Sequence, residues 1–557
     1  MGLFVLEDRH LEHVPGTATL DDLDEQNAGA QEHGIHGDLK KSKNGTILVP
    51  QPSDDPNDPL NYPLWRRDLI TSILCLASVI ASTLSPLLAA NTLSMVLYYN
   101  SPASPGDPRP PQRSFTDVAL LTGHHLLGVG VAGFVFVASA RIWGKRHLYL
   151  LGTVIIIVSS AWAGASGRNY GSLLAARFFQ GVGLAPFEAL VNASVGDLYF
   201  VHERGKRMAV SNLAVFGGAF LTPVIVGKMT ASLGWQWTHY FVAIFAAAML
   251  PLLFLLVPET AFKRDAKLDT DTAMITASTP DTTHTDKRPQ TATTPSSPPN
   301  SPPPRPVLSL HHPFFAPRLT PTPFPKLLLR PFPLFLHPSI LLSCLLQGTL
   351  IGWTVLIGIV LAAIMIGPPL FFNEVQTGYM YTGAALGALL GFVLAGALAD
   401  SVPRWLAKRN KGVFEPEFRL LLVVPQLLLG CGGLYGFGVT AADTGRYGWF
   451  WADFCFALVV AGMVLGAVAS ALYVVDAHRE VAVEGFTCLL VFKNVFSFGL
   501  TFSGYEWLVR GGVKEVFVAV GSVQVGICCL AGVLYVFGKR NRSFFARHDI
   551  LDFFHLK

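Results

Sequence analysis

The residues best suited to chemistry lie in one apolar stretch, "RFFQGVGLAPFEALV", which runs from Arg177 to Val191. The stretch is typical of a membrane span, yet it carries Arg177 and Glu188, and a charged side chain at the bilayer centre costs at least ~2.5–3.5 kcal/mol. On a helix these two residues face the same side but lie about 16 Å apart along the axis. They are too far apart to pair, so each needs its own partner or water.

Glu188 is the predicted group for taking up a proton or facing a cationic substrate, because desolvation favours the neutral form of an acid. Pro186 lies just before it, removes a backbone hydrogen bond and can open the helix there. The alternative is a buried, hydrogen-bonded glutamic acid that locks two helices together. Lys493 lies about 15 Å along a later apolar run. It is predicted to face a cavity or to have a buried partner.

The composition indicates a protein with many membrane spans. Of 557 residues, 51% are hydrophobic and 14% are charged, against about 25% charged residues in an ordinary soluble domain. The net charge of +4 gives no sign of a nucleic-acid partner. The cysteines form no C-x-x-C pair, so neither a metal nor a cofactor is expected. No Walker lysine loop is present, and "GVGVAG" (Gly128–Gly133) lies inside a span, where it favours helix packing over nucleotide binding.

Twelve apolar runs of spanning length are expected, six on each side of a polar linker. They lie at about 69–97, 116–140, 147–166, 171–196, 208–230, 238–258, 339–371, 376–399, 418–440, 447–474, 484–508 and 513–537. The chain then divides into a disordered cytoplasmic tail (1–66), a first six-helix half (67–258), a cytoplasmic Pro/Ser/Thr-rich linker (259–337), a second six-helix half (338–538) and a cytoplasmic C-terminal tail (539–557).

The distribution of Lys and Arg orients these spans. With both chain ends inside the cell, the short inner loops and the C-terminal tail hold fifteen Lys and Arg residues, against six in the outer loops. Because short cytoplasmic loops are enriched in these residues, both ends are predicted to be cytoplasmic.

Six stretches carry a family likeness through their order and spacing. They are "DPNDPLNYPLWRR" (Asp55–Arg67), "RFFQGVGLAPFEALVNASVGDLYFVHERGKR" (Arg177–Arg207), "VPET" (Val257–Thr260), "GVFEPEFRL" (Gly412–Leu420), "YVVDAHRE" (Tyr473–Glu480) and "FKNVFSFGLTF" (Phe492–Phe502). Together they resemble the major facilitator superfamily, and within it the fungal branch of twelve-span drug:proton antiporters. The resemblance implies an all-α membrane protein with the major facilitator fold, in which twelve transmembrane helices form two six-helix halves around a central cavity.

The resemblance also implies roles for particular residues. Arg177 and Gln180 match the family's Arg–Gln–Gly box, which is linked to proton coupling. Charges at the cytoplasmic helix ends are implied to act as an inner gate, with orientation by the positive-inside rule as the alternative; they are Arg141, Lys145, Arg146, Asp400, Asp476 and Arg479.

The fifth span carries part of the family's antiporter motif. It keeps Gly218, Pro223 and Gly227 but has Thr222 and Val226 at two glycine positions. The motif is expected to let this helix pack tightly or bend during transport. The two replacements weaken the argument for antiport without favouring another mode.

The leading hypothesis is a secondary active transporter, not an enzyme, that works by alternating access. It would export a small organic compound, a drug or secondary metabolite, with proton coupling, as a monomer in the plasma membrane or, alternatively, the vacuolar membrane. Aromatic residues in candidate cavity helices would suit apolar or cationic groups; they are Trp353, Tyr381, Phe496 and Tyr505. The alternatives are proton-driven uptake of a polyamine or another organic cation, with Glu188 as counter-ion, and a membrane sensor that does not transport.

Overall fold

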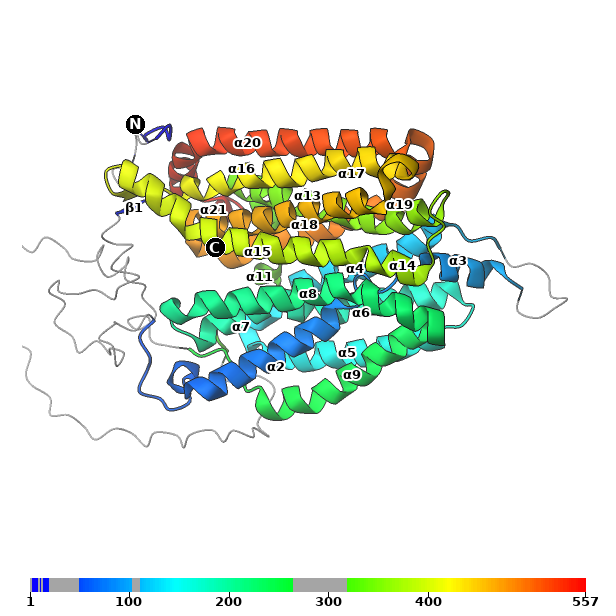
Figure 1. Ribbon diagram of the computed structural model, residues 1–557. Coiled ribbons are helices and arrows are strands. Elements are labelled where there is room, and N and C mark those ends of the chain that lie inside the picture. The colour runs from blue at the N-terminus through cyan, green and yellow to red at the C-terminus, as the bar shows by residue number, and fades with distance from the viewer. Residues whose placement is uncertain are drawn as a thin grey trace, which may run out of the picture.

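The computed structural model describes residues 3–8, 11, 14–19, 50–102, 111–263 and 318–556. Within these residues the chain is a bundle of long helices, with one two-stranded sheet formed by β1 (Ala18–Thr19) and β2 (Val413–Phe414) (Figure 1). The predicted parts at 20–49 and 264–317, which include most of the linker, lie outside the described residues.

The first half is coloured blue to green in Figure 1. Its six spans are α2 (Leu64–Ser82), α4 (Phe115–Trp143), α5 (Arg146–Ala165), α6 (Tyr170–Ala189) continued by α7 (Val191–Leu198), α8 (Val201–Leu233) and α9 (Trp235–Leu256). The short helix η1 (Pro59–Asn61) precedes α2, and α3 (Thr92–Asn100) connects α2 to α4.

The second half lies above the first in the view of Figure 1. Its spans are α13 (Pro338–Ile366), α14 (Glu374–Tyr379) with α15 (Tyr381–Arg409), the consecutive pieces η2 (Pro416–Leu422), α16 (Val423–Gln426), η3 (Leu427–Cys431) and α17 (Gly432–Ala442), then α18 (Thr444–Ala477), α19 (Ala482–Gly511) and α20 (Val513–Arg547). Four further short helices lie outside the spans. α11 (Phe324–Leu329) and α12 (Pro331–Leu334) precede the second half, and η4 (Arg479–Val481) and α21 (Ile550–Phe553) belong to it.

The predicted twelve-span architecture is confirmed. Among the described residues, ten segments are long and apolar enough to cross a membrane by themselves. The other two predicted spans are α2 and α6, in which charged side chains interrupt the apolar sequence. In α6 these are Arg177 and Glu188, the residues that single this helix out in the sequence.

Local sequence signals fix where the helices begin and end. Ser114 and Asp117 form a capping box at the start of α4, in which each side chain accepts from the other's backbone N–H. Gly144 ends α4 at a φ of 83°, and Gly234 and Gly512 connect α8 to α9 and α19 to α20 at φ values of 89° and 82°. These positive-φ conformations favour glycine, so consecutive helices are connected through turns of one or two residues.

The two halves contact each other along α4 with α19, and along α8 with α14 and α15. Small residues make these approaches close. A methyl group on Gly133 of α4 would lie 2.8 Å from Leu490, and one on Gly378 of α14 would lie 2.5 Å from the Pro223 carbonyl oxygen of α8. Gly133 belongs to "GVGVAG", so the packing interpretation of that motif holds.

The N-terminal residues that the structure describes are ordered against the second half, which corrects the predicted disorder of 1–66 for this part. Val5 is 2% exposed and packs with Phe414 and Phe418. Glu7 forms an ion pair with Lys539 at 2.9 Å, and Lys539 lowers the pKa of Glu7. β1 adds to β2 as an antiparallel partner. The short apolar patch at the start of the chain is therefore an anchor, because it buries apolar area on the end of the second half.

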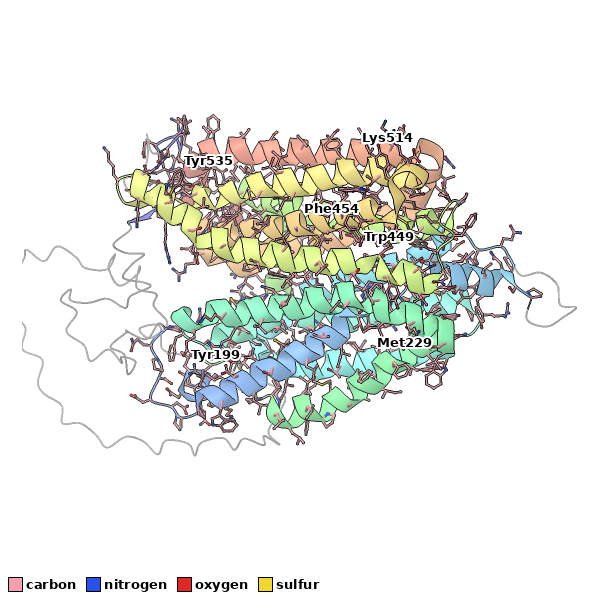
Figure 2. The ribbon with its side chains drawn as sticks, in the orientation of Figure 1. Tyr199, Met229, Trp449, Phe454, Lys514 and Tyr535 are labelled. Carbon is pink, nitrogen blue, oxygen red and sulfur yellow. The ribbon has the colours of Figure 1, made fainter. Side chains whose placement is uncertain are left out.

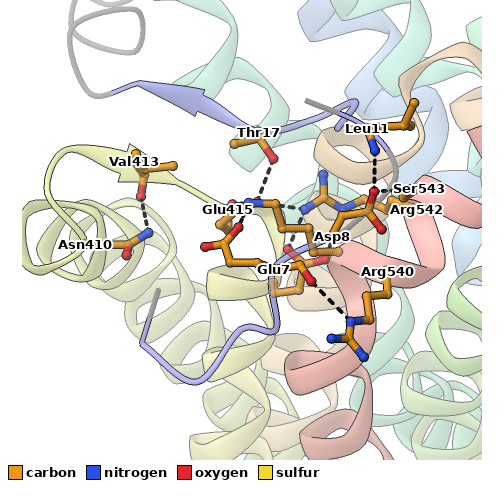
Figure 3. Close-up of polar contacts among 12 residues, drawn as sticks. Glu7, Asp8, Leu11, Thr17, Asn410, Val413, Glu415, Arg540, Arg542 and Ser543 are labelled. Atoms are coloured by element: carbon orange, nitrogen blue, oxygen red, sulfur yellow. Dashed lines mark hydrogen bonds and ion pairs between the residues drawn. The ribbon is translucent and has the colours of Figure 1, made fainter. Parts of the chain in front are cut away.

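A buried arginine organises this attachment (Figure 3). Arg542 of α20 is 2% exposed and pairs with Glu415 and Glu417, each at 2.8 Å. It also donates to the Pro15 carbonyl, while Thr17 donates to Glu415 at 2.7 Å. One charged cluster thus holds the N-terminal segment, η2 and α20 together.

Figure 2 helps to distinguish the two ends of the bundle. Tyr199 and Tyr535 lie toward one end, and Met229 and Lys514 lie at the other. We call the first the inner end, because it corresponds to the loops that the Lys and Arg distribution predicts to be cytoplasmic.

Candidate functional site

A cavity of about 180 Å³ lies between the two halves. Its walls come from both halves, mainly the 82–92 segment, α4 and α8 on one side and α13, α18 and α19 on the other. Aromatic and aliphatic side chains form most of the lining, among them Phe115, Phe216, Phe220, Tyr381 and Phe456. A mostly apolar pocket with a few polar groups is the usual form of a small-molecule site.

Two opposite charges occupy the inner part of this cavity. Glu188 of α6 and Lys493 of α19 both line it, and they form an ion pair with each other. Their side chains are 18% and 14% exposed. Glu188 is the only acid and Lys493 the only base among the described lining residues. The pair joins the first half to the second, and it leaves the cavity with no net formal charge.

Hydroxyl and amide groups supply the remaining polarity of the lining. Ser82, Ser85 and Thr92 come from the first half, and Asn494 and Ser497 follow Lys493 on α19. The Ser497 hydroxyl is buried and has no hydrogen-bond partner among the described residues. Such groups can orient a bound compound without requiring that it be charged.

The four predicted aromatic contacts are placed differently from one another. Tyr381 lines the cavity. Trp353 donates its ring N–H to Gln524 at 3.1 Å and packs edge-on against Phe496, and Tyr505 stacks on Phe115 with ring centroids 5.2 Å apart. Phe216, Phe220 and Phe456, which do line the cavity, were not singled out in the sequence. Nothing distinguishes them there from other phenylalanines in apolar helices.

Arg177 lies outside the cavity and is completely buried in the first half. Its guanidinium donates to the Leu84 carbonyl at 2.8 Å, to the Leu121 carbonyl at 3.3 Å and to the Gln180 side chain at 2.9 Å. These acceptors belong to the end of the first span, to α4 and to α6 itself. Arg177 therefore joins three segments without an acidic partner in the described chain.

Gln180 extends this network. Its amide nitrogen contacts the Ser160 hydroxyl and Nδ1 of His239, each at 3.2 Å. Nearby, Nε2 of His125 lies 3.1 Å from the hydroxyl of the cavity residue Ser85. Arg177 and Gln180 were identified from the sequence, whereas the contribution of His239 to this network was not.

The fifth-span glycines lie at close helix contacts, with Pro223 between them. A methyl group on Gly218 would lie 2.7 Å from the Val79 carbonyl oxygen of α2. One on Gly227 would lie 2.5 Å from the Glu374 carbonyl oxygen at the start of α14. The motif thus brings α8 close to its own half at one point and to the opposite half at another.

The charges at the inner end make contacts both across and within the halves. Arg141 of α4 forms an ion pair with Glu484 of α19, which crosses from the first half to the second. Arg330, just after α11, approaches the same carboxylate at 3.5 Å. The Glu484 side chain is 5% exposed, whereas that of Arg141 is 34% exposed, so the pair is buried on the side of the acid only.

Four of the other predicted gate residues have partners within their own half of the bundle. Lys145 pairs with Asp197 at 2.5 Å, and Arg146 donates to the Phe254 carbonyl at 2.7 Å. Asp400 and Asp476 both pair with Arg419, at 3.1 Å and 2.8 Å. Arg479 begins η4, between α18 and α19.

Glu259, just after α9, secures the turn between α4 and α5. It accepts from the backbone N–H groups of Lys145 and Arg146 at about 2.9 Å. Burial raises the pKa of Glu259, while these backbone donors act to lower it. Glu259 belongs to the "VPET" stretch, so one of the sequence signatures contributes to positioning Lys145 and Arg146.

Two six-helix halves around a central cavity, with an ion pair between them, define the chain as a multi-pass membrane transporter. It belongs to the Major Facilitator Superfamily, whose family model matches residues 63–483. The protein is a transporter and not an enzyme.

Its relatives are fungal transporters and related proteins. The chain is 24% identical to Protein HOL1 of Saccharomyces cerevisiae, over 96% of this chain and 96% of that protein. It is 26% identical to Efflux pump radE of Floropilus chiversii, over 88% of this chain and 84% of that protein. Among solved structures, a D-xylose-proton symporter superposes with a TM-score of 0.55 at 14% identity, over 83% of this chain and 97% of that one. The last likeness supports the fold alone.

Proposed function

We propose that this protein exports a small, amphipathic organic compound, a drug or secondary metabolite, across a fungal membrane by proton-coupled alternating access. The observation that carries the proposal is the Glu188–Lys493 pair, which lies in the cavity and joins the two halves. Relatives named as efflux pumps are consistent with export.

The lining favours an amphipathic substrate. Apolar and aromatic side chains supply most of the contact area, and a few hydroxyl and amide groups supply hydrogen bonds. Because Glu188 and Lys493 offset each other's formal charge, a compound in the cavity does not require a charge of its own. An aromatic or aliphatic body with one or two polar groups fits this environment.

The ion pair also provides a means of proton coupling. Protonation of Glu188 removes its negative charge, so its attraction for Lys493 falls to that of a hydrogen bond. The two side chains belong to opposite halves, and losing the attraction favours their separation. Proton binding at Glu188 is therefore linked to movement of the halves. Arg177 and Gln180 would act indirectly, by holding α6 against its neighbours.

A second candidate is proton-driven uptake of an organic cation, such as a polyamine. It is favoured by the single carboxylate of the described lining, since a substrate ammonium group can replace Lys493 beside Glu188. The two hypotheses differ in the direction of flux relative to the proton gradient. They also differ in whether the substrate must be cationic.

Flux into vesicles of known orientation tests the proposal. Purified protein is reconstituted and given a pH gradient, and uptake of a radiolabelled lipophilic aromatic compound is compared with uptake of radiolabelled spermidine. Substrate movement opposite to the protons, with the aromatic compound preferred, supports export. Spermidine movement in the same direction as the protons favours the second candidate.

Glu188→Gln examines the proton step directly, since it keeps the shape of the side chain while removing its titration. We expect insertion and exchange without a gradient to be retained, and pH-driven accumulation to fall at least tenfold. The control is Glu506→Gln on the same helix as Lys493, where the acid is 56% exposed. Accumulation by Glu188→Gln at the wild-type rate would eliminate the proton role.

A further inference from the structure

Helices α15 and α18 interlock through two matching rows of small residues. On α15 the row is Gly383, Gly387 and Gly391, at intervals of one helical turn. Ala457 of α18 faces Gly387, and Ala461 faces Gly391. The next position of the α18 row toward the outer end is Asp453, which faces Gly383. Asp453 thus occupies a position in the α18 row where the other two residues are alanines.

The carboxyl of Asp453 fills the space that the missing side chain of Gly383 leaves. A methyl group on Gly383 would lie 2.7 Å from Oδ2 of Asp453. Asp453 is 9% exposed, and its Oδ1 has no hydrogen-bond partner among the described residues. Its neighbour Phe454, labelled in Figure 2, is 45% exposed, whereas Asp453 lies against Gly383 of α15.

The groups around Asp453 do not compensate a negative charge. The backbone of Gly383 contacts this carboxyl. Tyr381 of α15 donates its hydroxyl to the Gly358 carbonyl at 3.2 Å, and Cys455 lies against Gly436 of α17. In the described chain, no Lys, Arg or His forms an ion pair with this carboxyl. A buried carboxylate without a cation is much less favourable than its neutral acid, even with one backbone contact.

Asp453 lies close to the central cavity. Phe456 is three residues further along α18, about 4.5 Å along the axis, and Tyr381 is two residues before Gly383 on α15. Phe456 and Tyr381 both line the cavity, and their ring centroids are 5.8 Å apart. A small separation of α15 and α18 at this point would therefore connect Asp453 to water in the cavity.

We propose that Asp453 is a second proton-binding carboxyl of the transporter, neutral while α15 and α18 are packed and ionised when they separate. In the packed state its O–H bond is intact. On separation the bond breaks, the proton passes to a water molecule of the cavity or the outer side, and the remaining carboxylate is hydrated. Repacking requires that the proton return. This inference deepens the proposed function, because it adds a proton site in the second half to the one at Glu188.

Infrared spectroscopy of the purified protein in lipid nanodiscs tests proton binding without a substrate. A protonated carboxylic acid has a carbonyl stretching band that a carboxylate lacks. At pH 7 we expect Asp453→Asn to remove such a band from the wild-type spectrum. The matched control is Asp443→Asn on the same helix, where the acid is exposed and caps α18, and it should leave the band in place. A band unchanged by Asp453→Asn would refute the proposal.

Asp453→Ala separates a proton site from a structural acid. Alanine continues the row formed by Ala457 and Ala461, so the thermal midpoint of unfolding should stay equal to or above that of the wild type. A large drop in that midpoint for both Asp453→Ala and the equally sized, uncharged Asp453→Asn would mean that an ionised carboxyl holds the helices together, contrary to the proposal.

Transport measurements then test release of the proton. Asp453→Asn should keep exchange without a gradient and lose at least tenfold in pH-driven accumulation, whereas accumulation at the wild-type rate would argue against release. If the wild-type protein accumulates neither test compound, the proposed function fails. The infrared result still decides whether Asp453 binds a proton.

Discussion

Glu484 is the position where a single substitution should most clearly open the inner end. Glu484→Gln removes the carboxylate charge that faces Arg141 and Arg330 but keeps the side-chain volume. Removing one partner of a fully buried ion pair costs about 3–5 kcal/mol. Arg141 is 34% exposed, so solvent screens part of this interaction. We therefore expect the inner-closed state to lose about 2–3 kcal/mol relative to an inner-open state.

That energy corresponds to a shift of about 30- to 150-fold in the ratio of open to closed molecules, at 1.4 kcal/mol per factor of ten. Double electron–electron resonance can measure it, with spin labels on the exposed positions 64 of α2 and 408 of α15, at the inner ends of opposite halves. Glu484→Gln should increase the long-distance fraction of the distribution.

The matched control is Glu480→Gln, because Glu480 is an exposed acid in the neighbouring η4. It should leave the distance distribution unchanged. Identical distributions for the wild type and Glu484→Gln would show that the cross-half pair does not hold the inner end closed.

Three further predictions concern helix packing, pH and the linker. Gly227→Leu should insert normally but lose at least tenfold in flux, because even a methyl group there would lie 2.5 Å from the Glu374 carbonyl oxygen. The control is Gly217→Leu, which should be active because position 217 has open space around it. Normal flux in Gly227→Leu would refute close packing. Burial lowers the pKa of His337 to about 4, against 6.5 in the unfolded chain. The folded protein therefore has its full stability from the neutral imidazole above pH 6.5. As the pH falls from 6.5 toward 4, the free energy of unfolding should decrease by up to ~1.4 kcal/mol per pH unit. Thermal melts should show this loss, and His337→Phe should reduce it; equal pH dependence in both proteins would contradict the assignment. Deleting residues 268–310 should leave membrane insertion intact, as measured by fluorescence-detected size exclusion, and aggregation of that variant would reveal a structural role.

The sequence was sufficient for the architecture because membrane insertion leaves few alternatives. Long apolar runs must become helices, since the bilayer offers no other hydrogen-bond partners to the backbone. The same reasoning found α6, although its charges make it less apolar than its neighbours. It could not find the ordered N-terminal segment, because the few apolar residues around Val5 gain a partner only when the end of the second half is assembled.

The candidate site was only partly predictable. Glu188 and Lys493 stand out because each is a charge in an apolar helix, but nothing in either helix indicates that they meet. They are 305 residues apart and belong to opposite halves. Arg141 was found through its loop, whereas Glu484 was not singled out. Apart from Tyr381, the cavity aromatics were missed, because sequence alone does not tell which face of an apolar helix meets the cavity.

The charged residues form two kinds of ion pair, those within one half and those between the two halves. Arg419 with Asp400 and Asp476 lies within one half, so a rocking motion of the halves leaves that cluster intact. Arg141 with Glu484 crosses the halves near the inner end, and Glu188 with Lys493 crosses them in the cavity. Opening the inner end must break the first of these pairs, and it must break or hydrate the second.

Each broken pair exposes its charges to water, which offsets much of the lost attraction. The net difference between states can therefore be a few kcal/mol, small enough for one bound compound and the proton proposed to bind at Glu188 to reverse. An apolar interface at the same positions would gain nothing from contact with water when it opened. It would therefore keep the protein in one conformation. The placement of ion pairs across the halves thus makes two states accessible, while the Arg419 cluster holds the inner end of the second half together.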